Sequence, residues 1–170
     1  MLKKRLIAII IVRDGEVVQS VRFEHTNTIH YSATFAVETF SNWSIDELCL
    51  INVSREKTGQ EKFVECVDAA SRECFVPLSV GGWIDDENYA ATLVRRGADK
   101  LVLNSAFHDN HELVKTLSLR FGKQCIVGSL DCKLMEDDTY GVAIDRGRKY
   151  LPVRPAEWAS QMEELGAGEI

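Results

Sequence analysis

Short, nearly continuous apolar runs alternate along the chain with longer amphipathic stretches. The apolar runs have the length of buried strands and lack the apolar–polar alternation of a half-exposed strand. They predict strands at 6–12, 48–53, 76–80, 101–103 and 125–130. The stretches between them predict helices at 32–40, 61–71, 87–96, 112–121 and 156–165. This order predicts an α/β protein with a parallel sheet, either open or closed into a barrel.

Turn and capping residues mark the ends of these segments. Asp14-Gly15 lies between two apolar runs and predicts a hairpin turn. Asp109 stands before one helix and predicts its amino-terminal cap. Residues 133–152 interrupt the alternation and predict a long insertion after the fifth strand. Glycines that end a helix with a positive φ are predicted at Gly97, Gly122 and Gly166.

The composition is that of an ordinary globular protein, and we expect residues 1–170 to form a single domain. Hydrophobic residues make up 45% and charged residues 27% of the chain. A formal net charge of -6 disfavours nucleic acid as a partner, and no apolar run is long enough to cross a membrane. The 5 cysteines form no CxxC pair, which favours a cytoplasmic location and no metal site. We expect no cofactor.

Several short strings together carry a family resemblance. They are Val80-Gly81-Gly82, Gly97-Ala98-Asp99-Lys100, Asn104-Ser105-Ala106 and Glu164-Leu165-Gly166-Ala167-Gly168-Glu169-Ile170. In this order, over the whole chain, they resemble the cyclase subunit of imidazole glycerol phosphate synthase, a family with a TIM (β/α)₈-barrel fold. Such a barrel usually needs about 250 residues. We therefore expect a truncated barrel of five βα units and the start of strand six, with a natural open form as the alternative.

The catalytic positions that the resemblance implies are partly altered. The family uses two aspartates, at the ends of strands one and five, as the acid and base of ring closure. Ile11 occupies the first position and cannot transfer a proton, whereas Asp131 retains the second. A lysine expected after the first hairpin is Gln19, and an aspartate expected on strand two is Asn52. Acid–base groups typically contribute a factor of about 10²–10⁴ to the rate, so enzyme activity stays an open question.

The resemblance also implies phosphate-binding residues. Gly82 belongs to a glycine-rich turn after strand three, and Asn104 and Ser105 follow strand four. Trp83 stands where the family has another glycine, and its bulk would crowd a phosphate group at this turn. A phosphorylated small-molecule ligand is therefore an open expectation.

A charged gate at the amino-terminal ends of the strands is the best-retained feature. In the family, four charged residues there admit ammonia from a glutaminase. The matching residues all keep their charge type, and they are Arg5, Glu47, Lys100 and Glu169. Asp99 matches a residue at the glutaminase contact. The simpler alternative is that these residues only pair with one another at the rim of the sheet.

Three functions follow from this pattern. The first is an ammonia-conducting subunit that pairs with a glutaminase and supplies a sugar amidotransferase, which makes acetamidino sugars of surface polysaccharides such as lipopolysaccharide. The second is an active cyclase of histidine biosynthesis, a lyase that uses ammonia and a phosphoribulosyl-formimino substrate to make imidazole glycerol phosphate. The third is a non-catalytic barrel fragment.

Overall fold

The structure is a computed structural model that describes residues 4–21, 25–145 and 147–170. The chain forms two compact units. Unit 1 comprises Met1–Trp83 and Asn88–Leu101, and unit 2 comprises Ile84–Glu87 and Val102–Ile170. The single domain expected for residues 1–170 stays a prediction.

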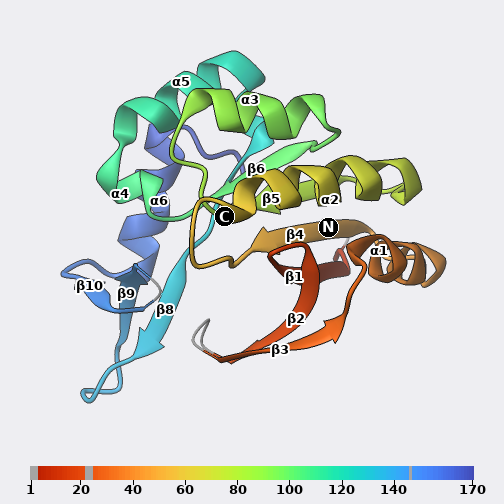
Figure 1. The fold of residues 1–170 in the computed structure, drawn as a ribbon. Coiled ribbons are helices and arrows are strands. Elements are labelled where there is room, and N and C mark those ends of the chain that lie inside the picture. The colour runs from red at the N-terminus through yellow and green to blue at the C-terminus, as the bar shows by residue number, and fades with distance from the viewer. Residues whose placement is uncertain (1–3, 22–24, 146) are drawn as a thin grey trace. The chain divides into compact units, whose positions relative to one another are not determined.

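Unit 1 contains a parallel sheet that carries an antiparallel extension (Figure 1). The parallel strands are β1 (Ile7–Arg13), β4 (Glu47–Asn52), β5 (Leu78–Gly81) and the start of β6 (Lys100–Leu103). The extension is formed by β2 (Glu16–Val21) and β3 (His25–His30), and the strand order is β3-β2-β1-β4-β5-β6. The helices are α1 (Ala33–Asn42), α2 (Gly59–Glu73) and most of α3 (Glu87–Arg95).

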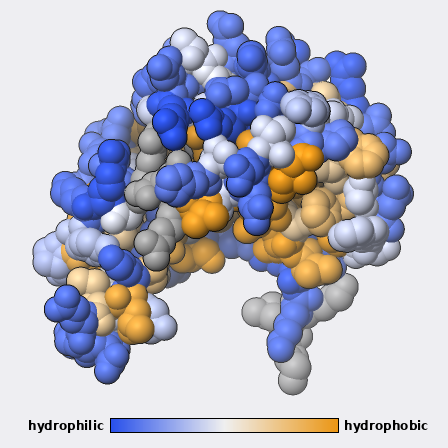
Figure 2. Space-filling view, turned by 60° about the horizontal axis from the view of Figure 1, so that its bottom comes forward, coloured by the Kyte–Doolittle hydropathy of each residue, from blue (hydrophilic) through white to orange (hydrophobic). Residues whose placement is uncertain are grey.

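The two faces of β1 differ in burial. Ile10 and Val12 are buried, whereas Ile7 and Ile9, on the opposite face, are 41% and 63% exposed. An apolar run of this kind is typical of a strand covered on both faces, so β1 leaves one of its apolar faces largely open. Hydrophobic side chains accordingly reach the surface, as the orange areas of Figure 2 show.

Unit 2 contains the end of β6, its neighbour β7 (Ile126–Gly128) and the helices α4 (Ala106–Asp109), α5 (His111–Phe121) and α6 (Pro155–Leu165). A short 3₁₀ helix, η1 (Lys123–Cys125), precedes β7. The predicted insertion is an antiparallel sheet of its own, with strands β8 (Asp131–Leu134), β9 (Tyr140–Ile144) and β10 (Lys149–Leu151). Glu169 forms an isolated parallel bridge with Val127, where the sixth strand of a barrel is expected.

The structure confirms the predicted alternation of strands and helices and corrects some details. Asp14 and Gly15 adopt φ angles of 52° and 91°, which confirms the hairpin turn. The predicted Asp109 cap is wrong, because Asp109 belongs to α4, an element that the sequence pattern did not predict. Asn110 caps α5 instead, since its side chain accepts a hydrogen bond from the Leu113 amide. Among the described residues, no helix is both long and apolar enough to cross a membrane. The cytoplasmic location stays a prediction.

Candidate functional site

A buried carboxylate lies at the amino-terminal edge of the unit 1 sheet. Glu47 begins β4 and is only 4% exposed. The Arg5 guanidinium donates to it at 3.0 Å, and the Lys100 ammonium lies 3.0 Å from both carboxylate oxygens. The Ser79 hydroxyl also donates to it, at 2.6 Å. We call these four residues the Glu47 cluster; they fix the position of one buried negative charge.

The strand register explains why these residues meet. Strands β1, β4 and β5 are parallel neighbours, so residues that begin them share one edge. Cys49 lies two residues beyond Glu47, on the same face of β4. Burial and the nearby Glu47 charge raise the pKa of the Cys49 thiol to about 12. The thiol therefore stays protonated and contributes no reactive group.

Three of the four predicted gate residues are brought together. Arg5, Glu47 and Lys100 belong to the Glu47 cluster, whereas Glu169 lies in unit 2. Asp99 lies at the same edge as the cluster, and its side chain accepts a hydrogen bond from the Leu78 amide at 2.8 Å. This bond gives Asp99 a role in fixing the start of β5.

The carboxyl-terminal edge of unit 1 lacks an acid at the predicted catalytic position. Ile11 pairs with Ile51 of β4, and both are apolar. Gln19 is exposed in the β2–β3 ladder, opposite Asn27. Asn52 is buried, and its Oδ1 accepts from the Ser54 amide, while its Nδ2 has no hydrogen-bond partner among the described residues.

The glycine-rich turn after β5 has an unusual backbone. Gly82 and Trp83 adopt φ angles of 101° and 58°. A Cβ added at Gly82 would overlap the carbonyl oxygen of Asn52, so close packing against β4 requires a glycine here. The Trp83 indole donates to the Ser54 carbonyl at 2.7 Å, and Gln60 donates to the Trp83 carbonyl at 3.0 Å. Sequence reasoning missed Ser54 and Gln60, because neither lies in a recognisable motif.

In unit 2 the remaining catalytic candidate lies beside a predicted phosphate ligand. Asp131 begins β8, and partial burial raises the pKa of its carboxyl, an effect opposed by a hydrogen bond from Asn104. The Asn104 amide also donates to the Ser129 carbonyl at 3.0 Å. Ser105 is the N-cap of the four-residue helix α4, and its side chain makes no capping bond.

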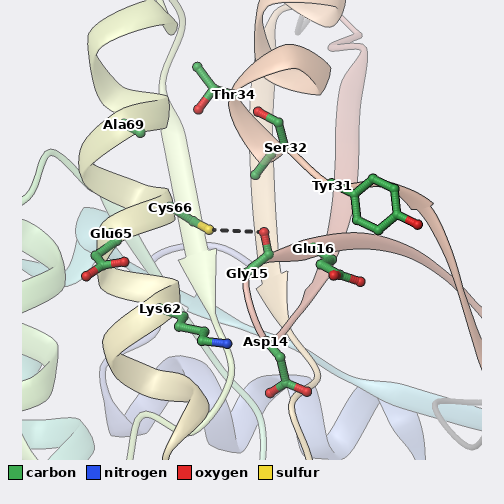
Figure 3. A pocket seen from close by; sticks show the side chains of 11 residues that line it. Asp14, Gly15, Glu16, Tyr31, Ser32, Thr34, Lys62, Glu65, Cys66 and Ala69 are labelled. Atoms are coloured by element: carbon green, nitrogen blue, oxygen red, sulfur yellow. Dashed lines mark hydrogen bonds between the residues drawn. The ribbon is translucent and has the colours of Figure 1, made fainter.

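A separate groove of about 440 Å³ opens between the β1–β2 turn, the start of α1 and the side of α2 (Figure 3). Its charged lining residues are Asp14, Glu16, Lys62 and Glu65. The Cys66 thiol donates to the Gly15 carbonyl at 3.6 Å, and burial raises its pKa. The sequence pattern gave no sign of this groove. Within the described part of the chain, no three His, Cys, Asp or Glu side chains are grouped to hold a metal ion.

Comparison with known proteins places the chain in a family. The model of the family described as "Histidine biosynthesis protein" matches residues 5–170. The chain belongs to this family. Its fold is therefore that of a TIM-barrel family, and the alternating strands and helices are consistent with an incomplete barrel.

Individual relatives agree with this assignment. The chain is 33% identical over 171 residues to "Imidazole glycerol phosphate synthase subunit HisF" of Staphylococcus epidermidis, covering 100% of this chain and 68% of that protein. It is 36% identical to "Putative imidazole glycerol phosphate synthase subunit hisF2" of Vibrio vulnificus, covering 62% of that protein. It is 32% identical to "Imidazole glycerol phosphate synthase subunit HisF" of Bacillus cereus and covers 67% of that protein. The chain thus spans about two thirds of these relatives.

Proposed function

We propose that this chain is an ammonia-receiving barrel subunit that docks to a glutaminase and has lost the proton-transfer chemistry of the cyclase. The observation that carries the proposal is the Glu47 cluster, a buried carboxylate held by two cations at the strand edge where the family admits ammonia. Removing such charges from water is costly, and a buried ion pair is often no better for stability than apolar packing. Its presence in this chain therefore supports a functional role.

The loops at the same edge support a docking partner. Each of the segments that enter β1, β4 and β5 carries one large exposed apolar side chain: Leu6 is 62%, Trp43 67% and Phe75 88% exposed. Aromatic side chains that are exposed in the free protein often become the energetic centre of a protein–protein interface. We propose that the glutaminase buries these three side chains and contacts Asp99 beside them.

The opposite edge of the sheet supports the proposed loss of proton-transfer chemistry. Ile11 offers no proton donor or acceptor, and its cross-strand neighbour Ile51 offers none to replace it. The ammonia would then leave for a separate enzyme. We propose a sugar amidotransferase as that acceptor, in line with the altered cyclase positions.

The second candidate function is a working cyclase, and Asp131 favours it. Its raised pKa makes it a better proton donor near neutral pH than an ordinary carboxyl, and Asn104 orients it. A single acid would then have to serve both proton transfers. This requirement makes the cyclase the weaker of the two candidates.

Glutaminase docking can be tested directly. We expect the purified chain to bind the glutaminase subunit of imidazole glycerol phosphate synthase in isothermal titration calorimetry and to stimulate its glutamine hydrolysis. The double variant Trp43→Ala/Phe75→Ala should bind at least roughly tenfold more weakly, because it removes two aromatic contacts. Ile29→Ala is the matched control, since Ile29 is 65% exposed in β3, away from this edge. A folded chain that neither binds nor stimulates the glutaminase contradicts the proposal.

A second assay separates the two candidates. The longest natural chain containing this sequence is given ammonium and the phosphoribulosyl-formimino substrate of the cyclase, beside an Ile11→Asp variant. We expect no turnover by the natural chain, because the first proton-transfer group is missing. Turnover by the natural chain would refute the loss of chemistry and establish the cyclase.

A further inference from the structure

The β8–β9 hairpin of unit 2 exposes large apolar side chains at its tip. Leu134 and Tyr140 lie directly opposite each other on the two strands, and they are 53% and 60% exposed. Met135, which follows Leu134, is 37% exposed. Further along β9, Val142 and Ile144 are buried and lie beside α6, whereas the tip extends away from that helix (Figure 1). A contiguous exposed apolar surface, unlike scattered single residues, marks an interaction site.

Hydrogen bonds hold the tip in one conformation. The Met135 amide donates to the Thr139 carbonyl at 2.8 Å and closes the turn. The Asp137 carboxylate accepts from the Thr139 amide at 3.1 Å and from the Thr139 hydroxyl at 2.6 Å. Asp138 completes the turn with a φ of 59°, a conformation that aspartate tolerates better than most residues. A surface that is ordered before binding loses little conformational entropy when a partner docks.

The turn between the two strands is strongly acidic. Residues 134–140 contain no lysine or arginine. The hydrogen bonds from Thr139 hold the pKa of Asp137 below its usual value, so this carboxylate is charged at neutral pH. Lys133 precedes the tip, but its ammonium lies over the Tyr150 ring, 5.3 Å from the ring centre. The acids of the turn are consecutive and exposed, and they are Glu136, Asp137 and Asp138. A complementary partner surface therefore combines an apolar pocket with lysine or arginine side chains.

The hairpin starts from the carboxyl-terminal end of a sheet strand. Gly128 ends β7, and Asp131 begins β8 three residues later. The glutaminase proposed above docks at the opposite, amino-terminal ends of the strands. The carboxyl-terminal ends, from which the hairpin projects, are therefore available to a different protein.

We propose that residues 134–140 form the docking surface for the enzyme that accepts the ammonia, and that this enzyme presents an apolar pocket flanked by basic side chains. The inference rests on the proposed function, since it requires a separate acceptor enzyme, and it adds the surface that the acceptor recognises. A second copy of the chain fits this surface poorly. Two identical tips in a symmetric contact would bring their acidic turns together.

The apolar contribution is tested by isothermal titration calorimetry of the chain with the purified sugar amidotransferase from the same organism. The wild-type chain should bind. Leu134→Ala/Tyr140→Ala should bind at least roughly tenfold more weakly, because it removes two side chains from the centre of the surface. Leu119→Ala is the matched control, since Leu119 is 88% exposed on α5 and lies outside the hairpin. Circular dichroism and urea unfolding confirm that each variant is folded.

The charge contribution is tested with Glu136→Gln/Asp138→Asn, a variant that keeps the hydrogen bonds of Asp137 and an asparagine at the left-handed position. It should bind the amidotransferase more weakly than the wild type and with a smaller dependence on salt concentration. Glu163→Gln/Glu164→Gln removes two exposed charges from α6 and should leave binding unchanged.

A coupled assay with the glutaminase connects this surface to ammonia transfer. Glutamine-dependent amidation should fall at least roughly tenfold for Leu134→Ala/Tyr140→Ala, because undocked chains release ammonia into solution. Amidation driven by added ammonium should not change, since it bypasses the chain.

The inference is overturned if the wild-type chain does not bind the amidotransferase, or if both hairpin variants bind it as the wild type does. It is also overturned if sedimentation shows that these variants alter only the self-association of the chain. Glutaminase binding is measured separately, so a chain that binds the glutaminase but fails these tests leaves glutaminase docking standing. A chain that binds the amidotransferase through the tip but no glutaminase contradicts the proposed function alone.

Discussion

Replacing Glu47 by glutamine removes a buried negative charge with almost no change in side-chain volume. In the wild type, Arg5, Lys100 and Ser79 all donate to this carboxylate. The glutamine oxygen can still accept from Ser79, but Arg5 and Lys100 no longer face the negative charge of Glu47. The stability cost therefore depends on how well water can solvate each cation.

The exposure of Arg5 and Lys100 determines how much stability Glu47→Gln loses. The Arg5 side chain is 46% exposed, so water takes over its solvation and the lost pair contributes at most about 1 kcal/mol. The Lys100 side chain is only 16% exposed, and it loses a carboxylate that lies 3.0 Å from its ammonium group. Removing one partner of a buried pair costs about 3–5 kcal/mol. Because Lys100 keeps some access to water, we expect a loss of about 3 kcal/mol for Glu47→Gln.

Urea unfolding of a double-mutant cycle with Lys100→Met measures this directly. Removing both charges should restore stability relative to Glu47→Gln, with a coupling energy of about 2 kcal/mol and an unchanged m-value. Asp68→Asn is the surface control, since Asp68 pairs with Arg72 and Arg96 at the surface, and it should have a far smaller effect. A loss below about 1 kcal/mol for Glu47→Gln, without coupling, would refute the description of this cluster as a desolvated ion pair.

Three further outcomes are expected. Gly82→Ala should lower the free energy of unfolding by about 2–4 kcal/mol, because the added Cβ would overlap the Asn52 backbone. Gly147 also has a positive φ but has open space around it, so Gly147→Ala should cost only about 1 kcal/mol. Equal losses for the two variants would contradict the packing argument. Because the folded pKa of Asp131 is raised above 3.8, its stabilising effect is present at lower pH and is lost as pH rises through the folded pKa. Asp131→Asn should therefore stabilise the chain at pH 7 in urea unfolding, and this advantage should shrink towards pH 4; a pH-independent difference would be inconsistent with the shift. In iodoacetamide labelling followed by mass spectrometry at pH 8, exposed Cys132 should react while buried Cys49, with its pKa near 12, stays unmodified unless the chain unfolds.

The sequence predicted those helices and strands for which the apolar pattern and the turn residues indicate the same boundaries. Apolar runs and positive-φ glycines located the parallel strands and the ends of the helices, because both signals act within a few residues. Helix α4 and strand β3 were not predicted. The first is a single turn, and the second, His25–His30, is polar and forms only by pairing with β2.

For the candidate site, the sequence identified residue types and the structure identified their partners. Arg5, Glu47 and Lys100 are far apart in the chain, and only the parallel register brings both cations to one carboxylate. The retained charges were therefore predictable from the family resemblance, but the burial of Glu47 was not.

Trp83, at the other edge of the sheet, is a second residue whose type is known from the sequence and whose partner is known only from the structure. The sequence alone determined that a bulky residue stands in a glycine-rich turn. Only the tertiary structure decided that its indole reaches the carbonyl of Ser54, a residue 29 positions away. The physical reason is that composition and periodicity are local properties of the chain, whereas hydrogen-bond partners and burial depend on which strands become neighbours.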